Sequence, residues 1–206
     1  MRRRYAAGRR RKHNPSTRAV AMPKQKAKGR LFENRVVIWG IDDSRRLFKD
    51  GYYGKPLGIP KPKDFDFSAP LILDLMEAYY LSIKKTIDVE DQSGKGLTSK
   101  QLQEICKESY SDFDEKFMVY RKLREAGYVV TPGIKFGSDF AVYEHGPGID
   151  HAPYIIQVMG PDSTMTATSM VRSGRLATTV RKQFIIAIPD SGKRTVEFLR
   201  YDWWRA

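Results

Sequence analysis

Cysteine is nearly absent from this chain of 206 residues, which contains only Cys106. A single cysteine excludes an intrachain disulfide framework and a zinc site built from several thiolates. Long apolar runs are also missing, and without ~18 consecutive apolar residues the sequence predicts no transmembrane helix. No apolar stretch follows the arginine-rich N-terminus, so we expect no secretory signal peptide. These absences favour a reducing, cytoplasmic location and no association with a membrane.

Acidic residues are absent from the first 30 positions, which hold 12 of the 37 lysines and arginines in the chain. The other 25 basic residues nearly balance the 24 acidic ones, so this segment carries almost all of the net charge of +13. A basic arm of this kind often contacts nucleic acid. The alternatives are a solvated tail or a true start at Met22. Because residues 1–30 show no hydrophobic periodicity, we predict a disordered basic arm.

Apolar residues follow two different patterns in the rest of the chain. In the first half their spacing predicts a helix that Pro70 opens and that runs to Lys85. Thr98 or Ser99 is a suitable N-cap for a second helix, and Asp112 for a third. The second half changes to short β-type runs with one helical stretch near residues 163–179.

These patterns predict an α+β chain with two domains. We expect a small, helix-rich α+β domain at residues 31–110 and an α/β domain with a mixed sheet at residues 111–206. A segment rich in glycine and proline, residues 50–67, is predicted to form a long loop in the first domain. Long loops of this kind are usually functional or disordered. This loop presents three lysines, Lys55, Lys61 and Lys63.

Several kinds of catalytic site are only weakly indicated by the residues themselves. A metal-dependent nuclease needs convergent carboxylates, and the candidates are Asp139 and Glu144. A cysteine–histidine pair would need Cys106 close to His151. However, Cys106 lies among helical apolar positions, which favours a buried, inert thiol. No Gly-x-Ser-x-Gly motif indicates a serine nucleophile.

Cleavage of RNA without a metal ion fits the polar residues of the second half better. This chemistry needs a base for the ribose 2′-hydroxyl, an acid for the leaving 5′-oxygen and a cation for the charge on the phosphate. Histidine, with a reference pKa of ~6.5, suits proton transfer, and lysine supplies a compact cation. Tyrosine, at a pKa of ~10, is a poor base unless a nearby cation lowers that value. Taken singly, Tyr143, His151 and Lys182 fit structural roles equally well.

Four ordered sequence blocks in the second half carry a more specific signal. They read YRKLREAGY at 120–128, GIKFGSDFAVY at 133–143, HAPYIIQV at 151–158 and GRLATTVRK at 174–182. Together they resemble the catalytic domain of the tRNA-splicing endonucleases, also called tRNA-intron lyases, of the archaeal type. The resemblance implies a mixed-sheet α/β catalytic domain with a restriction-endonuclease-like fold.

The catalytic trio of that family is a tyrosine, a histidine and a lysine, and it matches Tyr143, His151 and Lys182. The resemblance implies Tyr143 as general base, His151 as general acid and Lys182 as the group that stabilises the transition state. The implied activity is excision of introns from precursor tRNA at bulge–helix–bulge junctions, with 2′,3′-cyclic phosphate and 5′-hydroxyl ends and no metal or cofactor. Since all three residues are present, we predict a catalytic subunit. The alternative is a non-catalytic RNA-binding subunit of the same kind of assembly.

The resemblance also implies contacts with RNA and with other subunits. Arg175 matches one of two arginines that grip a bulge base in the family, and Arg200 is our choice for the second. The loop at residues 50–67 resembles the basic insertion of crenarchaeal catalytic subunits, which implies that its three lysines contact RNA. Asp162 matches the acidic interface loop of the family. We therefore predict an α2β2 heterotetramer with a non-catalytic paralogous subunit, with a homotetramer as the alternative.

Overall fold

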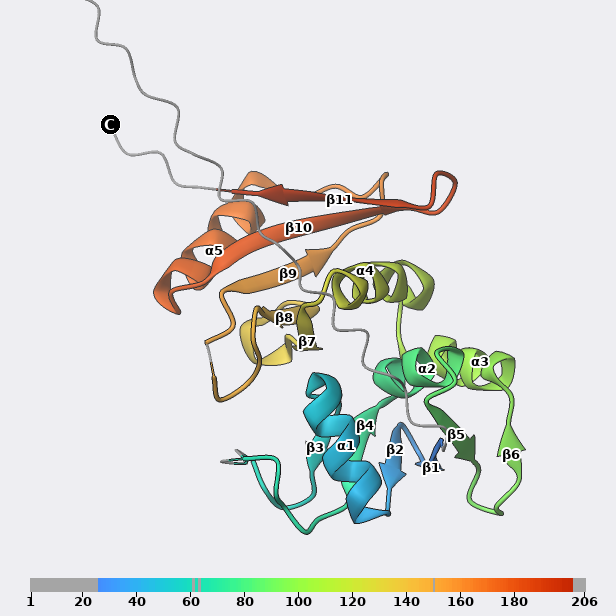
Figure 1. The fold of residues 1–206 in the computed structure, drawn as a ribbon. Helices are drawn as coiled ribbons and strands as arrows, with labels where there is room; N and C mark the ends of the chain where they lie inside the picture. Colours follow the sequence, from blue (N-terminus) through green and yellow to red (C-terminus); the bar gives the residue numbers. More distant parts are fainter. Residues whose placement is uncertain (1–25, 61, 63, 150, 202–206) are drawn as a thin grey trace, which may run out of the picture.

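The described part of the chain folds into two mixed β-sheets, each packed against helices. The computed structural model describes residues 26–60, 62, 64–149 and 151–201. Figure 1 shows the amino-terminal sheet in the lower half of the view and the carboxy-terminal sheet in the upper half. Helix α4 (Phe113–Glu125) lies between them. The predicted fold class is therefore confirmed, because the chain has an α+β architecture with two parts and a mixed sheet in each. None of the described helices is long and apolar enough to cross a membrane.

The amino-terminal sheet of the described chain has six strands in the order β3-β4-β2-β1-β5-β6. The strands are β1 (Ala27–Phe32), β2 (Arg35–Ile38), β3 (Lys55–Pro56), β4 (Leu71–Asp74), β5 (Ile87–Glu90) and β6 (Gly96–Leu97). Its helices are α1 (Ile41–Gly51), α2 (Leu75–Ile83) and α3 (Ser99–Ser109). Along β2, Val36 and Ile38 are fully buried while Arg35 is exposed. This alternation is what a sheet with one face toward the core requires.

Strand β1 corrects the boundary that we predicted for the basic arm. Residues 1–30 were expected to lack regular structure, yet β1 begins at Ala27 and pairs with β2 on one side and β5 on the other. Ala27 and Gly29 face the core, and such small residues leave no clear strand pattern in the sequence. Residues 1–25 lie outside the described part of the chain.

Strand β4 corrects the start that we predicted for the first long helix. Residues from Leu71 to Asp74 are extended, and α2 begins only at Leu75. A run of leucine and isoleucine suits a buried strand as well as a helix, and here Asp74 sets the boundary. Its carboxylate accepts from the N–H of Met76 at 3.0 Å, while the Glu77 carboxylate accepts from the N–H of Asp74 at 3.0 Å. This capping box starts α2, and the domain is richer in strands than we expected.

The two other predicted N-caps differ from each other. Thr98 caps α3 in a second capping box, in which its hydroxyl accepts from the N–H of Gln101 at 3.2 Å. Asp112 precedes α4, but its side chain makes no capping hydrogen bond and its φ is 53°. Gly127 follows the end of α4 with a φ of 93°, a conformation that suits glycine after a helix.

The carboxy-terminal sheet of the described chain has five strands in the order β11-β10-β9-β8-β7. They are β7 (Val129–Pro132), β8 (Phe140–Tyr143), β9 (Tyr154–Val158), β10 (Gln183–Asp190) and β11 (Thr195–Arg200), and the one-turn 3₁₀ helix η1 (Ile134–Phe136) precedes β8. Ile155 and Phe184 pack with Ala177 of α5 (Ala167–Thr179), whereas Ile156 and Ala187 join the larger core. The strands and the helix predicted after Gly127 are confirmed.

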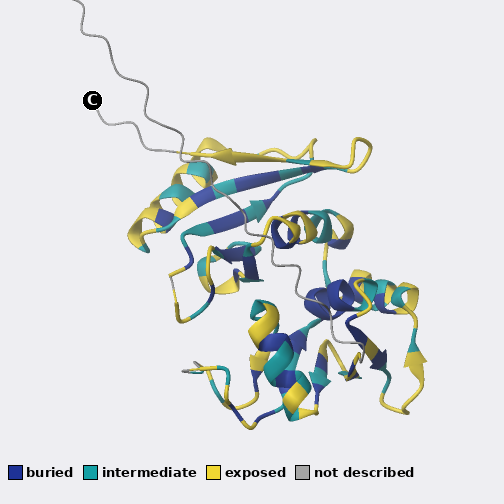
Figure 2. Ribbon diagram, in the orientation of Figure 1, coloured by how far each residue is buried: buried dark blue, intermediate teal, exposed yellow. Residues whose placement is uncertain are grey.

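Arg124 of α4 joins the two sheets. Its guanidinium donates to the carbonyl oxygens of Gly51 at 2.7 Å and Val130 at 3.0 Å, and it lies 3.6 Å from the Glu77 carboxylate. The same group stacks 4.4 Å above the ring of Tyr53. Figure 2 shows buried residues in α2, in α4 and in β8 to β10. They form one continuous core, so packing fixes how the two domains are placed.

Candidate active site

The register of three neighbouring strands brings Tyr143 and Lys182 to one edge of the carboxy-terminal sheet. Val142 in β8 lies opposite Tyr154 of β9, and Tyr154 lies opposite Gln183 of β10. Tyr143 follows Val142 and Lys182 precedes Gln183. Both therefore lie one residue beyond the row of paired residues that crosses the three strands, on the same side of that row. Backbone hydrogen bonds of the sheet set this alignment, and the edge where β9 and β10 begin lies at the left of Figure 1.

His151 lies at the same edge, three residues before β9. Its side chain is exposed, whereas the next residue, Ala152, is buried. The Nζ of Lys182 donates to the carbonyl oxygen of Ala152 at 2.5 Å, and the N–H of Gln183 donates to that of Pro153 at 2.8 Å. These two bonds attach the segment that carries His151 to the start of β10. The three residues of the predicted trio therefore lie at one sheet edge.

Lys182 is held in a half-buried position. Its backbone N–H donates to the carbonyl oxygen of Ala177 at 2.8 Å, which closes the end of α5. Its ammonium lies 4.9 Å from the ring centre of Phe136. Removal from water disfavours the charged form, so burial lowers the pKa of Lys182. An ammonium has three donors, and only one of them is used on Ala152, so this cation can also bind an anionic ligand.

Tyr143 is half-buried at the end of β8, where it pairs with Val129 of β7. Beyond Tyr143 the chain leaves the sheet in residues 144–149, which we call the 144–149 loop. Its turn is closed by a hydrogen bond from the N–H of Ile149 to the carbonyl oxygen of Gly146 at 3.1 Å. His151 is exposed beside this edge. The edge therefore presents a phenol, an imidazole and one fixed ammonium, and the first two are side chains that can act in proton transfer.

The carboxylates considered for a metal site are engaged with protein groups. Asp139 accepts from the N–H of Val158 at 2.7 Å and forms an ion pair with Lys116 at 3.1 Å. Glu144 accepts from the hydroxyl of Tyr154 at 2.9 Å, and this hydrogen bond raises the pKa of Tyr154. Across the described ranges, no three or more His, Cys, Asp or Glu side chains are grouped to hold a metal ion.

Sequence neighbours of Arg175 and Arg200 line a small hollow that also includes Lys182. The hollow has a volume of about 90 Å³ and is lined by Lys182, Gly174 and Tyr201, among others. Arg175 is exposed on α5 and follows Gly174, while Arg200 is exposed at the end of β11 and precedes Tyr201. The structure thus brings both predicted arginines to the end of the domain that carries the trio.

The other predicted contact residues lie apart from this edge. Lys55 is exposed on β3, the outermost strand of the amino-terminal sheet on that side, and it lines a larger cleft of about 630 Å³ between the two domains. Lys61 and Lys63 fall outside the described residues. Asp162 is exposed in the turn that follows β9, at the opposite end of that strand from His151.

The interdomain cleft also contains cations that sequence reasoning missed. Arg35, Lys116 and Lys135 line it together with Lys55. Arg35 is paired with Asp74 at 3.5 Å, whereas Lys135 is exposed. Lys135 lies in the sequence block at 133–143, but no motif places these residues in one cleft, because they come from distant elements that only the packing of the two domains brings together.

Comparisons with known proteins match both domains to the same family. Residues 27–103 match the family model described as "tRNA intron endonuclease, N-terminal domain", and residues 113–198 match "tRNA intron endonuclease, catalytic C-terminal domain". The tRNA-splicing endonuclease of Hyperthermus butylicus is 42% identical over 169 residues, which cover 82% of this chain and 93% of the relative. That of Saccharolobus islandicus is 38% identical over 177 residues, 85% of this chain and 97% of the relative. That of Pyrobaculum arsenaticum is 40% identical over 173 residues, 82% and 94% of the two chains.

Proposed function

This chain belongs to the tRNA-splicing endonuclease family, and we propose that it excises introns from precursor tRNA at the sheet edge that holds Tyr143, His151 and Lys182. It is an endoribonuclease, a tRNA-intron lyase. The observation that carries the proposal is the alignment of these residues at strand ends inside the part that matches the family's catalytic domain. For this reason we assign the chain as a catalytic subunit.

Tyr143 acts as the general base of a transesterification. In its ionised form, the phenolate oxygen of Tyr143 takes the proton of a ribose 2′-hydroxyl, and the 2′-oxygen attacks the adjacent phosphorus. The Nζ of Lys182, already fixed by the carbonyl of Ala152, stabilises the added negative charge. His151 donates a proton to the 5′-oxygen as its bond to phosphorus breaks. The products are a 2′,3′-cyclic phosphate and a 5′-hydroxyl, and no water or metal ion is needed.

The substrate that fits this edge is precursor tRNA with a bulge–helix–bulge. Unpaired bases in a bulge can be splayed out and stacked on flat guanidinium groups, which also frees the 2′-hydroxyl to attack in line. We assign Arg175 and Arg200 to this gripping role, since each is exposed and adjoins a residue, Gly174 or Tyr201, that lines the hollow with Lys182. Lys55, together with Lys61 and Lys63, contacts the RNA backbone through charge.

We propose that the protein works in the cytoplasm as an α2β2 heterotetramer of the crenarchaeal kind, with a non-catalytic paralogous subunit. Residues 113–198 match one catalytic domain, and in this assembly a second copy of the chain supplies the active site for the other end of the intron. Asp162 is exposed on a turn and is available to a neighbouring subunit. A homotetramer is the alternative assembly.

The test compares the wild-type chain with the His151→Ala variant on a bulge–helix–bulge RNA in excess chelator, with and without a host-cell fraction. We expect 2′,3′-cyclic phosphate and 5′-hydroxyl ends from the wild type and a loss of ~10²–10⁴ in rate for the variant. Activity without the fraction favours the homotetramer. A variant that cleaves as fast as the wild type would contradict the assignment of His151.

The same assay distinguishes a catalytic subunit from the alternative function, a non-catalytic RNA-binding subunit. Such a subunit would bind the RNA but yield no cleavage in either condition. The matched control is Lys193→Ala, since Lys193 is exposed in the turn before β11 and far along the strand from Arg200. Its cleavage rate should equal that of the wild type.

A further inference from the structure

The ring of Tyr52, in the amino-terminal domain, packs against Gly146 of the 144–149 loop. A Cβ atom placed on Gly146 would lie 2.4 Å from Cε2 and 2.6 Å from Cδ2 of Tyr52. No side chain beyond hydrogen fits at this point, so the ring touches the backbone of the loop. Gly146 is buried and has a φ of +130°, which residues other than glycine rarely adopt. The loop links Tyr143 to the segment of His151, so this contact bears on both.

Tyr52 has a backbone conformation in which a side chain is costly. Tyr52 ends α1 in the left-handed region, with a φ of 54° and a ψ of 35°. Glycine normally takes this position after a helix, because a side chain there costs roughly 1–2 kcal/mol. Gly51 stands one residue earlier and is the last residue of the helix instead. A glycine at this position would avoid the strain, and the packing of the Tyr52 ring offsets it here.

Two aromatic neighbours hold the Tyr52 ring. The Phe48 ring meets it edge to face at 5.3 Å and 71°, and the Phe65 ring is tilted against it at 5.5 Å and 56°. Phe48 is buried, and it also contacts Phe65 at 5.9 Å. Aromatic clusters of this geometry are stabilising and leave a ring few orientations. Gly146 therefore rests on a surface that the amino-terminal domain keeps in place.

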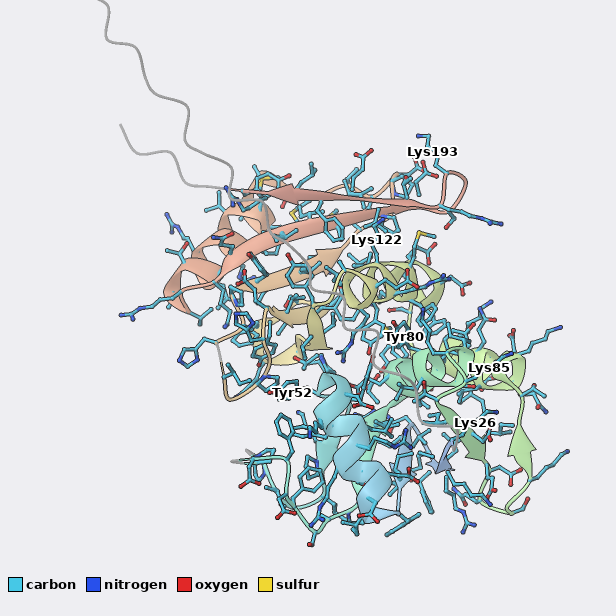
Figure 3. All side chains as sticks on the ribbon, viewed as in Figure 1. Lys26, Tyr52, Tyr80, Lys85, Lys122 and Lys193 are labelled. Atoms are coloured by element: carbon cyan, nitrogen blue, oxygen red, sulfur yellow. The ribbon has the colours of Figure 1, made fainter. Side chains whose placement is uncertain are left out.

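The residues on both sides of Tyr52 are also bound by the carboxy-terminal domain. Arg124 donates to the carbonyl oxygen of Gly51 at 2.7 Å and stacks 4.4 Å above the ring of Tyr53. Three consecutive residues of the amino-terminal domain thus each contact the other domain. Figure 3 labels Tyr52 at the upper end of α1, where the amino-terminal domain meets the carboxy-terminal one.

We propose that Tyr52 is a positioning residue for RNA cleavage, because its ring supports Gly146 and thereby fixes the loop between Tyr143 and His151. The inference rests on the proposed function of that edge. It gives the amino-terminal domain a part in the chemistry besides any contact with RNA. Tyr52 acts through the loop and touches no reacting atom.

The experiment measures single-turnover cleavage of a bulge–helix–bulge RNA by full-length variants, together with their RNA dissociation constants. Tyr52→Ala should cleave about 10- to 100-fold more slowly, since a misplacement of ~1 Å in a catalytic group can cost ~10² in rate. The dissociation constant should stay within about twofold, which separates positioning from binding. Tyr52→Phe keeps the ring and should recover most of the rate. Trp39→Ala is the matched control, because it removes an exposed aromatic of the same domain.

Two outcomes would overturn the proposal while leaving the proposed function intact. One is a Tyr52→Ala protein that cleaves like the wild type, and the other is a Tyr52→Phe protein as slow as Tyr52→Ala. Rates are compared well below the melting temperature of each variant. Gly146→Ala provides a second route if Tyr52→Ala does not fold, because it pushes the loop off the ring from the other side. It should slow cleavage to a similar extent, and a wild-type rate would contradict the model.

Hydrogen–deuterium exchange tests whether Tyr52 orders the 144–149 loop, independently of cleavage activity. Peptides that cover the 144–149 loop should exchange faster in Tyr52→Ala than in Trp39→Ala and the wild type. Unchanged exchange of this loop in Tyr52→Ala would contradict the proposal even if that variant cleaved slowly. Absence of cleavage by the wild type would instead contradict the proposed function, and the exchange result would still decide whether Tyr52 orders the loop.

Discussion

Burial makes Cys106 an inert thiol, as its place in the apolar pattern predicted. Its side chain is fully buried, and the Sγ lies 3.6 Å from the carbonyl oxygen of Leu75, to which it donates. Desolvation is the main reason that the pKa of this thiol rises to about 12, and the nearby Asp74 charge adds to it. The reactive thiolate is therefore scarce in the folded protein at neutral pH.

We predict that Cys106 of the folded protein resists iodoacetamide at pH 8 and reacts at once in concentrated urea. Because the folded pKa lies above the unfolded value near 9, ionisation favours unfolding. The thiol's contribution to stability is complete below pH 9 and is lost as the pH rises toward 12. Mass spectrometry of alkylated protein measures the first effect, and urea midpoints at pH 8 and pH 10.5 measure the second. Rapid labelling of the native protein would contradict the burial of Cys106.

At the scale of elements, the capping boxes fix where two helices begin. Thr98 serves only the start of α3, whereas Asp74 also binds the hydroxyl of Tyr110 and pairs with Arg35 at 3.5 Å. We predict that Thr98→Ala lowers the free energy of unfolding by about 1 kcal/mol, and that Asp74→Ala lowers it more. Urea titration checks the order. Glu104→Ala, on the exposed side of α3, is the control and should stay within about 0.5 kcal/mol.

Sequence patterns predicted elements well where one period dominates. The strands after Gly127 and the helix that Thr98 caps were found, because alternation and capping act over a few residues. Strand β1 was missed because Ala27 and Gly29 supply no bulky apolar face. Strand β4 was taken for helix because four residues of Leu-Ile-Leu-Asp fit either period. For the site, the trio followed from motif blocks, whereas Tyr52 and the cleft cations depend on contacts that no local pattern encodes.

At the scale of the whole molecule, Arg124 couples the domains. Its buried guanidinium is satisfied by the Gly51 and Val130 carbonyls, by the hydroxyl of Tyr120 at 3.0 Å and by Glu77. Burial raises the pKa of Glu77, and the Arg124 charge opposes that rise. Removing one partner of such a pair leaves the other as an uncompensated buried group, which is costly.

We predict that Arg124→Leu lowers the free energy of unfolding by about 3–5 kcal/mol. Adding Glu77→Leu should cost less than the sum of the two single changes, because the unpaired carboxylate is then gone as well. Chemical denaturation of the four proteins in a double-mutant cycle gives the coupling energy. Strict additivity would show that Arg124 and Glu77 act independently.

The central place of β1 has a consequence for how the protein is made. Among the described elements this strand is synthesised first, yet one of its two partners, β5, follows more than 50 residues later. At roughly 5–20 residues per second, the nascent β1–β2 hairpin waits some seconds with one open edge. Such an edge can pair with another nascent chain. Synthesis at high ribosome density therefore favours aggregation before the sheet is complete, and slower initiation of translation is the remedy that this topology suggests.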